Sequence, residues 1–139
     1  MDARLIFWPA IAMVALTIVV WLRMFFVRTA QIKREHIRLR EIANSRGAAE
    51  KLTDSAPADN FRNLFELPVL FYLALVVAFL TAQVNALTLG LAWAFVALRY
   101  LHSAIHCTSN RVLHRFYAYV AGGFTLWALW ATLALGLLR

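Results

Sequence analysis

The longest uncharged stretches of the sequence limit the folds that the chain can adopt. Residues 116–138 carry no charged side chain, and neither do residues 5–22. About 20 apolar residues in an α-helix cross the roughly 30 Å hydrocarbon core of a bilayer. Two further apolar runs, 64–82 and 86–106, each contain a single charged residue. The sequence therefore predicts four transmembrane helices at about 5–26, 64–82, 86–106 and 116–138.

The composition supports an all-α integral membrane protein. Of 139 residues, 63% are hydrophobic and 15% are charged, whereas soluble domains average about half and a quarter. We expect one domain, residues 1–139, folded as a four-helix bundle in contact with membrane lipid. The net charge of +7 does not indicate nucleic-acid binding, because the basic residues flank the apolar runs, as in membrane proteins. The single Cys107 excludes an internal disulfide and a multi-cysteine metal site.

The distribution of basic residues predicts the orientation. The loop at about 29–61 carries Lys33, Arg34, Arg38, Arg40, Arg46 and Lys51. The short loop after the third span adds Arg111, whereas the opposite side has only Arg4 and Arg139 near the chain ends. Loops rich in lysine and arginine remain in the cytoplasm. Both termini are therefore expected outside the cytoplasm.

The long loop has a predicted organisation of its own. Residues 31–42 are good helix formers, so they extend the first span or form a short surface helix. The stretch 44–47 is expected to end that helix at Gly47. Pro57 is expected to interrupt the chain again, and Asp59 or Asn60 to cap the second span.

Polar side chains at the cytoplasmic ends of three spans recur at helical spacing. They are Arg62, Asn63 and Glu66; Arg99, His102 and His106; and Arg115 and Tyr119. A charge inside a bilayer costs at least about 2.5 kcal/mol, so it normally faces a partner or a wet cavity. Glu66 is the only acidic residue within a span, which makes a Glu66–Arg99 pair the natural expectation.

This polar cluster has two interpretations. It is either a structural ion pair with hydrogen-bonded histidines, or a pocket that binds an anion from the cytoplasm. The excess of arginine over Glu66 favours the anion site. The i, i+4 pair His102 and His106 could also ligate a metal, but further ligands are lacking unless Glu66 or Cys107 joins them, and Arg99 would repel a cation. We therefore predict no metal site.

Several motifs resemble the MAPEG family of membrane-associated proteins in eicosanoid and glutathione metabolism. They are FRNLFELP at 61–68, RYLHSAIH at 99–106, Asn110–Arg111, and RFYAY at 115–119. The similarity extends over nearly the whole chain and is greatest with the small bacterial members. It implies a four-helix bundle that assembles as a homotrimer in the bacterial inner membrane, with periplasmic termini. It also implies a glutathione site between adjacent subunits, and a lipophilic substrate that arrives through the bilayer.

The resemblance implies roles for the polar residues. Asn63, Glu66, Arg99, Arg115 and Tyr119 match the glutathione site, with Arg62 and His102 beside them. Arg115 is the candidate that stabilises the thiolate, and His106 replaces a family tyrosine as a catalytic donor.

The implied activity is that of a glutathione-dependent transferase or peroxidase acting on lipophilic electrophiles. Asp59, His102, His106 and Phe116 depart from the pattern of the characterised enzymes. The alternative is a non-catalytic protein that binds a small anion or lipid, or that serves as an accessory subunit of a larger membrane complex.

Overall fold

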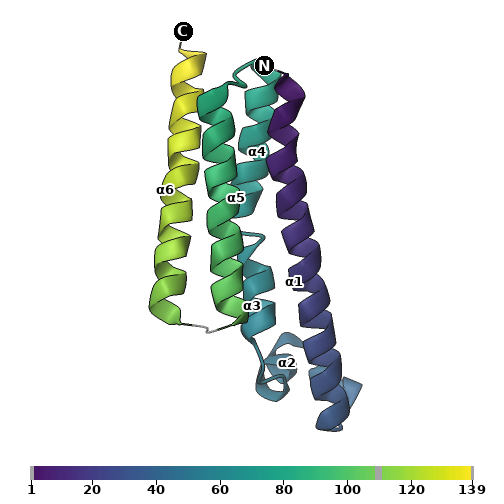
Figure 1. Cartoon of the computed structure of the whole chain (residues 1–139). Helices are drawn as coiled ribbons and strands as arrows, with labels where there is room; N and C mark the ends of the chain where they lie inside the picture. Colours follow the sequence, from purple (N-terminus) through teal and green to yellow (C-terminus); the bar gives the residue numbers. More distant parts are fainter. Residues whose placement is uncertain (1, 109–110, 139) are drawn as a thin grey trace.

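A computed structural model describes residues 2–108 and 111–138. Within this part the chain is helical, with four columns of helix side by side (Figure 1). The elements are η1 (Ala3–Ile6), α1 (Phe7–Arg34), η2 (Leu39–Ile42), α2 (Ser45–Lys51), α3 (Ala56–Asn63), α4 (Leu67–Leu80), α5 (Ala86–Cys107) and α6 (Val112–Leu137). Asn110 and Arg139, which entered the sequence arguments, lie outside the described residues.

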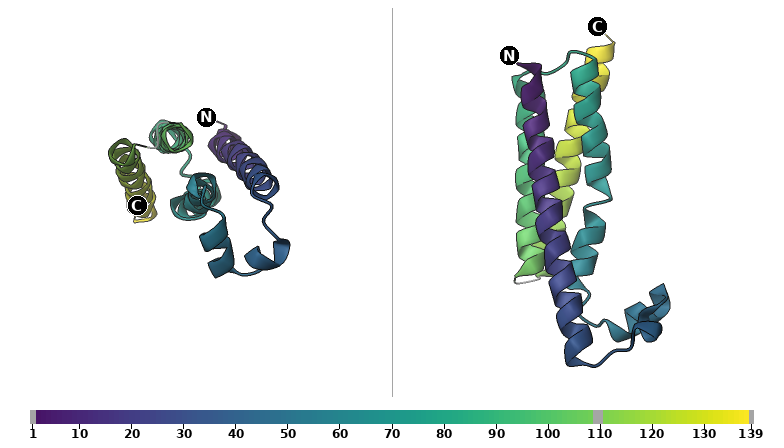
Figure 2. Two further views of the ribbon diagram at one scale, coloured as in Figure 1. Left: turned by 90° about the horizontal axis from the view of Figure 1, so that it is seen from below. Right: turned by 90° about the vertical axis from the view of Figure 1, so that its right-hand side faces the viewer.

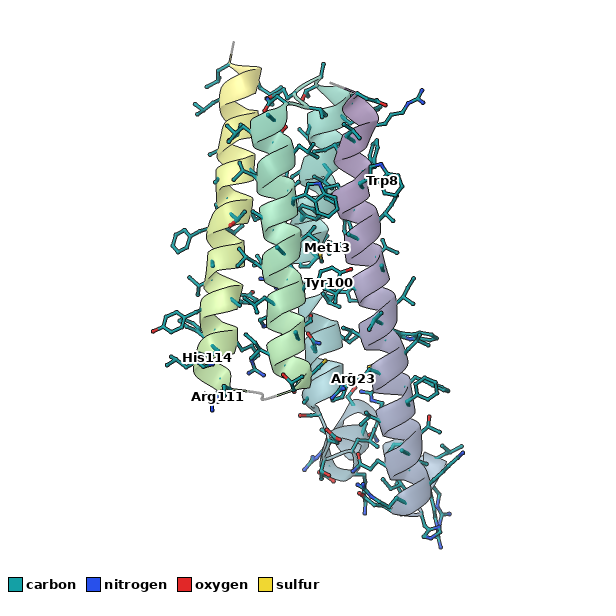
Figure 3. All side chains as sticks on the ribbon, viewed as in Figure 1. Trp8, Met13, Arg23, Tyr100, Arg111 and His114 are labelled. Atoms are coloured by element: carbon teal, nitrogen blue, oxygen red, sulfur yellow. The ribbon has the colours of Figure 1, made fainter. Side chains whose placement is uncertain are left out.

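The four columns confirm the predicted four-helix membrane fold. Each is long and apolar enough to cross a bilayer, with α3 and α4 together forming one column. Both chain ends lie at one end of the bundle, and α2 lies at the other, in the segment that connects α1 to α3 (Figures 1 and 2). The outer surface is apolar: Trp8, on the outer side of α1, is 59% exposed (Figure 3). The chain is an integral membrane protein.

The apolar core joins the four columns. Met13, Phe71, Phe95 and Leu126 are fully buried in one cluster, and the Phe71 and Phe95 rings stack with centroids 4.5 Å apart. Viewed along the bundle, α5 lies between α6 and α1 (Figure 2). It packs against both of them and against α3. This arrangement directs different faces of α5 towards different neighbours.

The second column is broken near its middle, which the sequence prediction missed. The helix stops at Asn63 and restarts at Leu67, with Glu66 as the residue before the new helix. Pro68 explains the break, because it has no N–H to donate to the Leu64 carbonyl and its ring would clash with that group. The expectation from helical spacing that Arg62, Asn63 and Glu66 lie on one continuous helix is therefore wrong.

The loop before α3 agrees with the prediction only in part. The first helix continues to Arg34, as one of the two alternatives predicted, but His36 then adopts a positive φ of 50° and the extension ends before residue 42. Asn44 begins a helix instead of ending one, because its side chain accepts a 2.7 Å hydrogen bond from the Gly47 N–H. Pro57 lies in the first turn of α3, where proline is tolerated. Asp59 and Asn60 lie inside α3 and cap nothing.

Candidate functional site

The site is built around Arg99, which α5 buries against α6. Arg99 is only 1% exposed. The guanidinium carbon lies 5.4 Å from the centre of the Phe95 ring and 4.8 Å from that of Tyr119. Nη2 donates to the Tyr119 carbonyl at 3.3 Å, but Nε and Nη1 have no hydrogen-bond partner among the described residues. Arg99 is thus a buried cation covered by two aromatic rings. Two of its three guanidinium nitrogens lack a hydrogen-bond acceptor in the described part of the chain.

Gly122 makes room for this guanidinium. A Cβ atom at position 122 would lie 3.0 Å from Arg99 Nη2 and 3.3 Å from Nε. Real Cβ atoms seldom approach a neighbour so closely. The absence of a side chain at Gly122 therefore lets α6 pass directly over the cation.

Tyr119 separates Glu66 from Arg99. Its ring covers the guanidinium, and its hydroxyl donates to Glu66 Oε2 at 3.2 Å. The ion pairs found in the described part of the chain do not include one between Glu66 and Arg99. The sequence prediction of a direct Glu66–Arg99 pair is therefore corrected. The link between the two charges passes through Tyr119.

A second contact joins the C-terminal end of α5 to the N-terminal end of α6. Arg115 Nη1 and His106 Nε2 are 2.8 Å apart. A guanidinium only donates hydrogen bonds, so the imidazole nitrogen must accept. The His102 ring lies 5.9 Å from that of His106 and 6.0 Å from that of Tyr119. His106, His102 and Tyr119 thus form a continuous series of ring contacts across α5 and α6.

These residues border a pocket of about 210 Å³. Its lining is Asn63, His102, Val112, Arg115, Phe116 and Tyr119. Glu66, Arg99 and His106 do not line it, but each contacts a residue that does. Most of the polar residues singled out in the sequence therefore meet at one place, on α3, α5 and α6.

Arg62 does not join this group. It forms a 3.8 Å ion pair with Asp59 and is largely exposed. It borders a different pocket of about 440 Å³, which Arg28 and Asp54 also line. The break in the second column separates Arg62 from Glu66, since these two residues do not lie on one continuous helix.

The comparison with protein families agrees with this geometry. A model of the MAPEG family matches residues 6–135, which include nearly all of the four columns and every residue that lines the pocket. The chain belongs to the MAPEG family. No curated protein and no solved structure matches it.

This MAPEG protein also has a buried polar contact that the sequence reasoning missed. Ser103 Oγ donates to Asn60 Oδ1 at 3.1 Å, and Asn60 Nδ2 lies 3.4 Å from Cys107 Sγ. Arg23 of α1 donates to the Cys107 carbonyl at 2.8 Å (Figure 3). Ser103 follows Arg99 by four residues, so the helical spacing could have revealed it. These bonds fix α5 against α1 and α3, so α5 presents Arg99 and the histidines to α6.

The polar residues do not form a metal centre in the described part of the chain. No group of three histidine, cysteine, aspartate or glutamate side chains there is close enough to hold an ion. His106 contacts an arginine, which would repel a cation at the same position.

Proposed function

We propose that this MAPEG protein binds glutathione at the Arg99–Arg115 site and uses its thiol on lipophilic electrophiles, as a transferase or peroxidase. The observation that carries the proposal is the state of Arg99. A buried guanidinium with two unpartnered N–H groups is costly, and a ligand rich in acceptor oxygens would supply what it lacks. Glutathione has two carboxylates.

The neighbouring groups suit the remaining parts of glutathione. Glu66, at the helix break, offers a carboxylate for the ligand's ammonium group. Arg115 borders the pocket, and a cation beside a thiol favours the thiolate that attacks electrophiles. In a conjugation, the thiolate sulfur forms a bond to the electrophilic carbon while the leaving group departs with its electron pair. The apolar surroundings would admit a lipophilic substrate from the bilayer.

We propose that the complete site forms in a homotrimer. The pocket within one chain, about 210 Å³, is smaller than the roughly 300–1,000 Å³ of typical ligand sites. A neighbouring subunit over its open side would enlarge and enclose it. We further propose that the protein lies in a bacterial inner membrane with periplasmic termini. The basic loops support this orientation, in which the pocket would face the cytoplasm.

A second candidate function is non-catalytic binding of a small anion or lipid, alone or as an accessory subunit of a larger membrane complex. The position of Arg62 favours it. Because Arg62 pairs with Asp59 and borders another pocket, fewer cations remain for two carboxylates than the sequence suggested. Phe116 also contributes an apolar ring to the pocket lining.

Turnover measurements separate the two candidates. The purified protein should conjugate glutathione to a chlorodinitrobenzene-type electrophile or reduce a lipid hydroperoxide, and Arg115→Gln should lower the rate at least tenfold. Arg111→Gln, an exposed arginine one turn away on the same helix end (Figure 3), is the matched control and should retain the rate. Glutathione binding without turnover would favour the second candidate. Cross-linking in membranes should give trimers, and a purely monomeric protein would contradict the shared site.

A further inference from the structure

The contact between Arg115 and His106 is unusual in its chemistry. Arginines are commonly paired with carboxylates, whereas the partner of the half-buried Arg115 in this contact is an imidazole nitrogen at 2.8 Å. Arg115 cannot accept a hydrogen bond, so His106 Nε2 must be unprotonated. The ring proton therefore belongs on Nδ1. That atom is buried and has no hydrogen-bond partner within the described residues.

A neutral acceptor has a specific consequence for the charge of the site. A carboxylate in place of His106 would fix Arg115 but would also cancel its charge. The imidazole fixes one N–H group of the guanidinium and, being neutral, does not itself cancel the positive charge. His106 is itself almost completely buried, and the Arg99–Tyr119 contact and the His102 ring lie on the same side of α5. Its position is thus set by packing, independently of any ligand.

We propose that His106 is a positioning residue, whose neutral imidazole holds the Arg115 guanidinium at the rim of the pocket without neutralising it. This role concerns the orientation of Arg115 and needs no contact between His106 and the ligand. Its importance for glutathione chemistry rests on the proposed function. The contact itself does not.

The tautomer of His106 tests the contact directly. In protein labelled with ¹⁵N-histidine, the His106 signals are those that disappear in His106→Gln. At neutral pH they should report an unprotonated Nε2 and a protonated Nδ1. A ring protonated at Nε2, or at both nitrogens, would overturn the proposal, because neither can accept from Arg115. His114→Gln, an exposed histidine on α6 (Figure 3), controls for the assignment.

Two substitutions at position 106 test positioning against simple packing. His106→Gln retains a neutral acceptor, whereas His106→Leu retains bulk and removes the acceptor. Loss of a hydrogen bond to a charged group should weaken glutathione binding about tenfold or more in His106→Leu. His106→Gln should stay within about threefold of the wild type, and both variants should melt at similar temperatures. Equal binding by the two variants, whether both weak or both unaffected, would overturn the positioning role.

The outcomes distinguish this proposal from the proposed function. If the wild type fails to bind glutathione, the glutathione function fails. The tautomer measurement then decides the positioning claim alone, since it requires no ligand.

Discussion

The ring of Tyr119 lies over the guanidinium of Arg99, with 4.8 Å between the guanidinium carbon and the ring centre. The Tyr119 carbonyl also accepts from Arg99 Nη2 at 3.3 Å. One residue of α6 therefore supplies both an aromatic face and an acceptor to the buried cation of α5. A cation–π contact of this desolvated kind is worth about 2 kcal/mol or more.

Substitutions at Tyr119 should separate its ring from its hydroxyl. Tyr119→Phe keeps the ring and loses only the bond to the exposed Glu66, so it should cost at most about 1 kcal/mol of stability. Tyr119→Leu also loses the cation–π contact and should cost clearly more. The free energy of unfolding can be measured by denaturant titration in detergent micelles. Equal losses of unfolding free energy in the two variants would mean that the Tyr119 ring does not stabilise the buried Arg99.

Gly122 offers a test of the close approach between α6 and Arg99. Gly122→Ala places a methyl group about 3.0 Å from Nη2, and such overpacking typically costs about 1–3 kcal/mol. The matched control is Gly90→Ala on α5, where nothing lies within 4 Å of the new Cβ. The first change should lower the unfolding temperature, and the second should leave it unchanged or raise it slightly. An unchanged unfolding temperature in Gly122→Ala would contradict the close packing of α6 against Arg99.

The sequence predicts the fold better than the site, for physical reasons that particular residues illustrate. The number of transmembrane spans follows from hydropathy, which depends only on the amino-acid composition of each segment. The break before α4 can also be predicted from the sequence, because Pro68 cannot donate a hydrogen bond to the Leu64 carbonyl. The sequence prediction did not include the effect of this break on the position of Glu66. The position of Tyr119 between Glu66 and Arg99 cannot be predicted from the sequence. Helical spacing shows which residues share a face, but not which face of α6 meets that of α5.

Cysteine labelling can test the predicted orientation. Ala43→Cys lies in the long basic loop and Ala86→Cys at the opposite end of the bundle, both exposed. In a Cys107→Ser background, an impermeant thiol reagent added to intact cells should label position 86 and leave position 43 unlabelled. Reversed labelling would place the pocket on the other side of the membrane.

The loop after α1 should respond to acid through Glu35. Gln31 Nε2 joins this carboxylate, at 3.2 Å, to the Thr53 hydroxyl at 3.0 Å. The hydrogen bond from Arg34, and then that from Gln31, lower the pKa of Glu35 below its ordinary value of 4.5. Stabilisation by this carboxylate is therefore present above that ordinary pKa and is lost as the pH falls through the lowered one.

A spin label at Ala43→Cys, again with Cys107→Ser, can report this local change. Its mobility should rise as the pH falls below about 4.5, whereas Gln31→Leu should make it mobile at neutral pH as well. Glu50→Gln, at an exposed carboxylate of α2, is the control and should preserve the wild-type response. If neither acid nor Gln31→Leu changes the mobility of the label, the hydrogen bonds of Gln31 to Glu35 and Thr53 do not hold the loop.

Calorimetric titration of the purified protein with glutathione tests the central claim most directly. The account predicts saturable binding that Arg115→Gln weakens at least tenfold, since the variant loses a charged hydrogen-bond donor at the pocket. Arg111→Gln should bind like the wild type, because this arginine lies outside the pocket lining. Absence of saturable binding up to millimolar glutathione, or equal affinity of the wild type and Arg115→Gln, would contradict the account.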